Sequence, residues 1–147
     1  MSNGIPAGSS AQVLVVDDDH EILAVVRDVL ESEGYKVETA ANGEDALAAV
    51  ARLLPDLIML DVNMPQVDGW EVLGRLRAAA GPQTPVVVMT AGYLAQDQAL
   101  ASGAQGYLGK PFDLDDLLSA VGAHAGLPME GSREVRRRSA SPPGAGQ

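Results

Sequence analysis

Short apolar runs alternate with amphipathic stretches along most of the chain. The five runs cover residues 13–16, 36–40, 57–60, 86–89 and, more weakly, 106–108. Where apolar residues follow one another instead of alternating with polar ones, as in 13–16, 57–60 and 86–89, they predict strands that are covered on both faces. Strands buried in this way are typical of a parallel sheet with helices on each side.

Helical spacing dominates the segments between the runs. Ile22, Leu23, Val26, Val29 and Leu30 form a stripe along one helix face. Similar stripes cover residues 46–51 and 70–76, and helical patterns at 94–101 and 114–121 complete the set. Five strand–helix units in about 115 residues predict an open α/β sheet with parallel strands and right-handed crossovers.

Local signals support these boundaries. Three predicted helices begin with an acid or amide that is followed three residues later by a second acid: Asn42 with Asp45, Asp68 with Glu71, and Asp113 with Asp116. Gly34 is placed to end the first helix. We therefore expect one domain over residues 11–124, with disordered tails at 1–10 and 125–147 that are rich in Gly, Ser and Pro.

The composition of the 147-residue chain excludes several kinds of chemistry. It has no cysteine, which removes disulfides, thiolate nucleophiles and sulfur-ligated metals, and its 2 histidines are too few for a histidine-rich metal site. No window approaches the roughly 20 apolar residues of a membrane helix, and the N-terminus has no signal-peptide pattern. We expect a cytoplasmic protein without membrane contact.

The net charge of −10 is unevenly distributed. Residues 1–127 hold 18 acidic and 6 basic side chains, whereas residues 128–147 hold 2 acidic and 4 basic ones, including Arg136, Arg137 and Arg138. An acidic body repels nucleic acid phosphates, so direct binding of DNA or RNA is not expected.

Polar residues that can carry chemistry follow four of the five predicted strands. Asp17, Asp18 and Asp19 follow the first strand, Asp61 ends the third, Thr90 ends the fourth, and Lys110 follows the fifth. Each alone is ordinary, because an aspartate in this place is commonly a helix cap. Together they point to a site, since open α/β sheets bind ligands beyond the carboxyl ends of their strands.

Carboxylates at the ends of neighbouring strands would lie about 5 Å apart. Two unit charges at that separation repel by roughly 3 kcal/mol at an effective dielectric of about 20, whereas protonating one aspartate at pH 7 costs about 4 kcal/mol. Three such groups must raise a pKa or bind a cation. An all-oxygen site with few protein ligands favours Mg²⁺ and phosphoryl chemistry, in which Lys110 neutralises charge, Thr90 donates a hydrogen bond and a carboxylate acts as nucleophile.

Four segments carrying these residues resemble bacterial response-regulator receiver domains. The segments are 13–19 (VLVVDDD), 55–69 (PDLIMLDVNMPQVDG), 86–91 (VVVMTA) and 103–112 (GAQGYLGKPF). They occur in the family's order on the expected strands, and the resemblance covers about residues 11–124. It implies a flavodoxin-like, doubly wound sheet of five strands in the order 2-1-3-4-5 with five helices.

The resemblance also implies an acceptor and a metal site. Asp61 matches the residue that accepts a phosphoryl group from a sensor histidine kinase or a histidine phosphotransfer protein. Asp17 and Asp18 match the acidic pair that binds Mg²⁺, and the main-chain carbonyl of Asn63 matches a further ligand. The acyl phosphate is expected to hydrolyse slowly without a second enzyme.

A switch is implied by the same resemblance. Thr90 matches the switch hydroxyl, Tyr107 the aromatic switch residue, and Lys110 the phosphate-binding lysine, with a cis bond before Pro111. Phosphorylation is expected to change the face formed by the fourth helix, the fifth strand and the fifth helix, and so to control a partner protein.

Three further positions lie close to the site residues. The resemblance places Asn63 and Gly92 at positions where the side chain tunes the lifetime of the phosphoryl group. Gly109, directly before Lys110, is smaller than the apolar residue expected there.

We expect a stand-alone receiver, a monomer or a phosphorylation-dependent dimer, that turns over no external substrate. The main alternative is a phosphohydrolase of the haloacid-dehalogenase type, but His20 and Glu21 follow Asp17-x-Asp19 where that family has a threonine two residues later. A flavodoxin lacks support, because no hydroxyl- and glycine-rich loop follows the first strand. A binding module that is never phosphorylated would not need the complete set of site residues.

Overall fold

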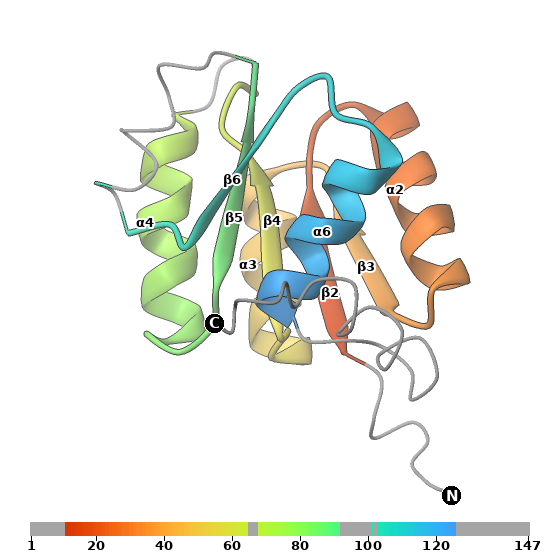
Figure 1. Cartoon of the computed structure of the whole chain (residues 1–147). Helices are drawn as coiled ribbons and strands as arrows, with labels where there is room; N and C mark the ends of the chain where they lie inside the picture. The colour runs from red at the N-terminus through yellow and green to blue at the C-terminus, as the bar shows by residue number, and fades with distance from the viewer. Residues whose placement is uncertain (1–10, 65–67, 92–100, 102, 126–147) are drawn as a thin grey trace, which may run out of the picture.

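The computed structural model describes residues 11–64, 68–91, 101 and 103–125. Five parallel strands form one sheet in the order β3-β2-β4-β5-β6, which confirms the predicted order 2-1-3-4-5 (Figure 1). The strands are β2 (Gln12–Val16), β3 (Lys36–Ala40), β4 (Leu57–Asp61), β5 (Val86–Thr90) and β6 (Gly106–Gly109). The helices are α2 (His20–Ser32), α3 (Gly43–Leu53), α4 (Gly69–Ala80) and α6 (Leu114–Ala125).

Helices cover both faces of the sheet, as the continuous apolar strands predict (Figure 1). Along β2, Leu14 and Val16 pack into the core shared with α3 and α4, whereas Val13 and Val15 pack into the core shared with α2 and α6. β4 and β5 are buried along their whole length. Because successive side chains of a strand point to opposite faces, one short apolar run supplies two cores.

The predicted helix starts are confirmed by hydrogen bonds. Asn42 accepts from the backbone N–H of Asp45, and Asp68 accepts from the N–H groups of Trp70 and Glu71. The Asp113 carboxylate accepts from the N–H of Asp116. At the end of α2, Gly34 has φ of 100°, a left-handed conformation that favours glycine.

Gly69 begins α4 at a point where only glycine fits. A Cβ atom at this position would lie 2.3 Å from the Cα of Val62, which follows Asp61 directly. Because the contact is with backbone, a larger residue would have to move the chain next to β4. The missing side chain therefore lets α4 pack closely against the segment after Asp61.

Some sequence-based expectations fall outside the described residues. The helix expected at 94–101 does so apart from Ala101, and so do the expected tails, apart from Ala125, which ends α6. Among the described residues, the structure has no helix long and apolar enough to cross a membrane.

Candidate functional site

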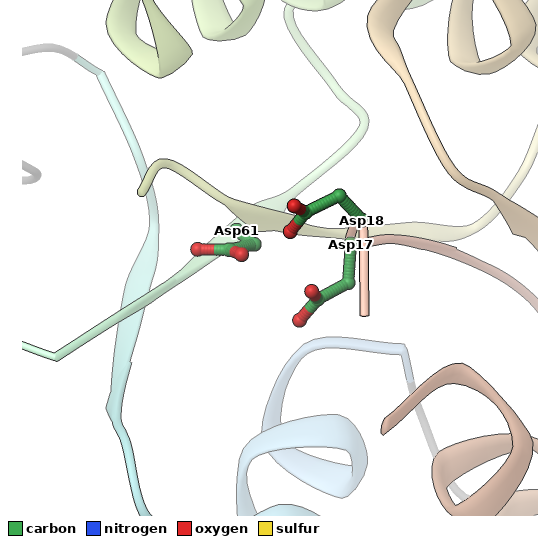
Figure 2. A group of neighbouring side chains, drawn as sticks. All are labelled: Asp17, Asp18 and Asp61. Atoms are coloured by element: carbon green, nitrogen blue, oxygen red, sulfur yellow. The ribbon is translucent and has the colours of Figure 1, made fainter. Parts of the chain in front are cut away.

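The parallel pairing of β2 with β4 brings the predicted acids together. Val16 pairs with Leu60, so the residues that follow them, Asp17 and Asp61, lie side by side at the carboxyl edge of the sheet. Asp17, Asp18 and Asp61 each offer a carboxylate oxygen, and these oxygens lie within 4.8 Å of one another (Figure 2). The expected convergence of three carboxylates is confirmed.

The three carboxylates differ in their exposure to solvent. Asp17 is fully buried and Asp61 is 2% exposed, whereas Asp18 is exposed. Burial raises the pKa of Asp61, and the neighbouring Asp17 raises it further, while the N–H of Asn63 and the charge of Lys110 lower it. The net pKa of Asp61 is raised, so its negative charge is held at a cost in free energy.

Lys110 reaches this cluster although it stands 93 residues after Asp17 in the chain. Its Nζ atom lies 2.8 Å from Oδ2 of Asp17 and 3.3 Å from Oδ2 of Asp61. The Lys110 N–H donates to the carbonyl of Thr90 at 2.8 Å, which fixes the start of the side chain beside β5, and the bond to Pro111 is cis as expected. Burial lowers the pKa of Lys110, but its bonds and charge interactions with the two aspartates outweigh burial and raise it.

The charges of the cluster remain unbalanced. Three carboxylates face one ammonium group, which leaves a formal charge of −2 in a partly buried place. All the available ligand atoms are oxygens, the type that hard divalent cations prefer. Asp17, Asp18 and Asp61 could therefore hold a divalent cation, whereas Asp19 is occupied as the cap of α2, where it accepts from Glu21 and Ile22.

Thr90 is buried, and its hydroxyl is bonded to Asn63. The Thr90 Oγ1 donates to Oδ1 of Asn63 at 2.7 Å, and the same oxygen accepts from the N–H of Ala91 at 3.0 Å. The N–H of Asn63 donates to Oδ1 of Asp61 at 2.8 Å. Asn63 therefore links two strand ends, because its backbone bonds to the end of β4 and its side chain bonds to the end of β5.

Tyr107 lies on β6 beside Gly109. A Cβ atom at Gly109 would lie 3.2 Å from the Tyr107 hydroxyl oxygen and 3.6 Å from the ring. The small residue that stood out in the sequence thus leaves room for the aromatic side chain. Gly92, the other expected tuning position, lies outside the described residues.

Sequence reasoning placed most of these groups but missed the role of the Asn63 side chain. The family resemblance assigns only the main-chain carbonyl of Asn63 to the metal site, and it connects the Asn63 side chain with the lifetime of the phosphoryl group. The amide lies 27 residues from its partner Thr90 in the chain. A signal was present, because Asn63 stands two residues after Asp61, but the sequence does not show the direction of its side chain.

The family model for the response regulator receiver domain matches residues 13–122. The response regulator MprA of Mycobacterium leprae is 42% identical over 114 residues, which are 76% of this chain and 50% of that protein. The transcriptional regulatory protein TrcR of Mycobacterium tuberculosis is 39% identical over 116 residues, 78% of this chain and 45% of that protein. The chain thus spans about half the length of the curated relatives it matches.

Solved structures agree with the sequence matches. The chemotaxis response regulator CheY4 of Vibrio cholerae superposes with a TM-score of 0.72 and 37% identity, and the match covers 78% of this chain and 98% of that chain. The similarity therefore extends over a whole receiver-sized structure.

Proposed function

The chain belongs to the family of response regulator receiver domains of two-component signalling, and from this premise we propose that it accepts a phosphoryl group on Asp61. The observation that supports the proposal most directly is the cluster of Asp17, Asp18 and Asp61 with Lys110 at the carboxyl edge of the sheet. Asp61 is the member at the end of the central strand β4, between β2 and β5.

The donor in this proposal is a phosphohistidine on a sensor kinase or a phosphotransfer protein. A carboxylate oxygen of Asp61 forms a bond to phosphorus, and the bond from phosphorus to the histidine nitrogen breaks. The electron pair of that bond returns to the imidazole ring, which leaves as the neutral group once its charge is balanced by one proton. Little covalent chemistry is required of the receiver, so positioning and charge stabilisation supply most of the catalysis.

Lys110 and the acidic pair divide the work of charge stabilisation. The Lys110 ammonium, which is already bonded to Asp17 and Asp61, can also stabilise the negative charge on the oxygens of the transferred phosphoryl group. We propose Mg²⁺ as the cofactor, held by the carboxylates of Asp17, Asp18 and Asp61 and the main-chain carbonyl of Asn63. When bound, Mg²⁺ neutralises charge and orients the phosphoryl oxygens. Water would later hydrolyse the acyl phosphate and restore the carboxylate.

The output in this proposal is a change of surface that a partner protein reads. Thr90 would donate its hydroxyl to a phosphoryl oxygen, and Tyr107 would follow into the space that Thr90 leaves. A cytoplasmic location, the absence of direct contact with nucleic acid, and a monomer or phosphorylation-dependent dimer remain predictions. The expectation that the receiver acts without a further domain also stays a prediction.

Intact-mass spectrometry tests the acceptor directly. Acetyl phosphate with Mg²⁺ is expected to add one phosphoryl group to the wild-type chain and none to Asp61→Asn. Asp56→Asn is the matched control, because Asp56 lies at the other end of β4 and accepts from the N–H of Gln12. An equal adduct on Asp61→Asn, or no adduct on the wild type, would overturn the proposal.

Phosphate release separates the receiver from a phosphohydrolase. The receiver is expected to release one equivalent of phosphate for each acyl phosphate formed on the protein. Sustained hydrolysis of p-nitrophenyl phosphate, lost in Asp61→Asn, would instead show an enzyme that acts on external substrates.

A further inference from the structure

The Asn63 amide makes two hydrogen bonds whose direction the chemistry fixes. The backbone N–H of Ala91 can only donate, so the amide atom that faces it at 3.0 Å must be the oxygen, Oδ1. The Thr90 hydroxyl lies 2.7 Å from the same oxygen. Because this oxygen carries no proton, Thr90 must be the donor in that bond.

A hydroxyl group has one proton to donate. While the Thr90 proton lies between Oγ1 and Asn63, it is not available to a group on Asp61. The bond therefore competes with the one that the proposed function requires, in which Thr90 donates to a phosphoryl oxygen. A charged phosphoryl oxygen is the stronger acceptor of the two, so it can draw the proton away from a neutral amide.

We propose that the Asn63 side chain is a positioning residue that holds the Thr90 hydroxyl in the resting receiver and releases it when Asp61 is phosphorylated. This inference rests on the proposed function. It assigns to the amide a role separate from that of the main-chain carbonyl of Asn63.

Asn63 is suited to a bond that forms and breaks. Thr90 is 1% exposed, so its hydroxyl needs a protein partner, whereas Asn63 is exposed, so water can take the place of the Thr90 hydroxyl at Oδ1 when the hydroxyl leaves. The second bond, from the N–H of Ala91, does not depend on the Thr90 proton. The amide therefore keeps the backbone after β5 in place while the Thr90 side chain moves.

The resting receiver tests this inference without any phosphoryl group. In Asn63→Leu, which is similar in size but has no acceptor, the NMR signal of the Thr90 methyl group is expected to move toward its position in the wild type saturated with beryllofluoride and Mg²⁺. Beryllofluoride affinity is expected to rise about three- to tenfold, the factor that corresponds to loss of one competing neutral hydrogen bond.

Two controls separate release of the hydroxyl from general loosening of the site. Asn63→Asp keeps an oxygen facing Thr90 and Ala91, so in the absence of Mg²⁺ and beryllofluoride the Thr90 signal is expected to stay at the resting position. Thr84 is an internal reference, because it precedes the start of β5, whereas Thr90 ends it, and its hydroxyl donates to the carbonyl of Ala80 at the end of α4. Its methyl signal is expected to stay unchanged in both variants.

The outcomes distinguish the two proposals. If wild-type Thr90 does not respond to beryllofluoride and Mg²⁺, the proposed function itself is wrong. If the wild type responds but Asn63→Leu leaves the Thr90 signal in place, or if Asn63→Leu and Asn63→Asp shift it equally, Asn63 does not hold the hydroxyl. If the gain in affinity persists undiminished in the Thr90→Val background, the gain does not act through Thr90 and the inference is also overturned.

Discussion

Polar groups are paired differently at the amino ends of the strands, here called the amino edge of the sheet, and at their carboxyl ends, the carboxyl edge. At the amino edge, where β5 and β6 begin, the Arg77 guanidinium donates to the carbonyl oxygens of Gly81, Thr84 and Gly103 and to the side chain of Gln105. Its five N–H groups are suited to hold several carbonyl oxygens at once. This arrangement joins the end of α4 to the segments that lead into both strands.

Gln105 completes the arrangement at the amino edge. Its Oε1 accepts from the N–H of Val86 at 2.8 Å, and its Nε2 donates to the carbonyl of Gly103 at 3.0 Å. At the carboxyl edge, by contrast, three carboxylates face one ammonium group. One edge satisfies its polar groups within the protein, and the other keeps an excess of charge that an external cation and a phosphoryl group can complete.

This contrast predicts that loss of Arg77 costs stability but not function. In Arg77→Met, the carbonyl oxygens and Gln105 lose their donor, so the free energy of unfolding is expected to fall by about 2 kcal/mol. Urea denaturation measures the loss, and intact mass measures the phosphoryl adduct of the folded variant. Unchanged stability, or a folded variant without an adduct, would contradict the division between the edges.

The opposite result is expected for Asp61→Asn. Since burial and Asp17 raise the pKa of Asp61, its ionised form is disfavoured in the folded state, and the amide is expected to stabilise the protein by about 1–2 kcal/mol at pH 7. The folded protein holds the proton more tightly than the unfolded chain. The penalty from the ionised group is therefore largest above the folded pKa and disappears as the pH falls toward the ordinary value of about 4.

Urea denaturation of both proteins at about five pH values between 8 and 4 measures the difference in their free energies of unfolding. The gain from Asp61→Asn is expected to shrink steadily on acidification. A variant that is less stable than the wild type at pH 7, or a gain that grows toward pH 4, would show that the carboxyl edge is not electrostatically strained.

Magnesium is expected to relieve part of the same repulsion. At about ten times its dissociation constant, a cation that binds only the folded state adds about 1.4 kcal/mol, or a melting-temperature rise of roughly 4 °C for a domain of this size. Asp18→Ala is expected to remove most of that rise. Calorimetry with and without MgCl₂ measures it, with Asp56→Asn as the control that keeps the full response.

The smallest expected effect is at Gly109. A Cβ atom there would meet the end of the flexible Tyr107 side chain at 3.2 Å, so Gly109→Ala is expected to change stability by less than about 0.5 kcal/mol while it alters the Tyr107 ring signals. Gly74→Ala, with nothing within 4 Å of the added Cβ, is the control and should stabilise α4 by about 0.5–1 kcal/mol. Unchanged ring signals in Gly109→Ala would mean that Gly109 does not set the position of Tyr107.

Much of the fold could be predicted because buried strands and helices have recognisable patterns of apolar residues over short stretches of sequence. A run such as 57–60 is apolar at every position, and β4 is indeed buried on both faces. Caps such as Asn42 act on a residue three positions away, so sequence spacing alone is enough to find them. The strand order was expected from the family resemblance and is confirmed by the pairing.

The candidate site was predictable in its residues but not in its contacts. The acids, Thr90 and Lys110 were found because each follows a strand, and all strands of a parallel sheet end at the same edge. The sequence could not predict which polar groups bond to each other, since Asn63 and Thr90 stand 27 residues apart and each has several possible partners.

The sequence by itself determined the apolar runs, the helix stripes and caps, and the charged residues at the strand ends, because these depend on neighbours within one or two helical turns. Only the tertiary structure decided that Lys110, 93 residues from Asp17, bonds to it, that Asn63 accepts the Thr90 proton, and that Arg77 joins two loops of the amino edge. Such bonds depend on which strands are neighbours and in which register, and packing sets that arrangement through many weak contacts along the whole chain.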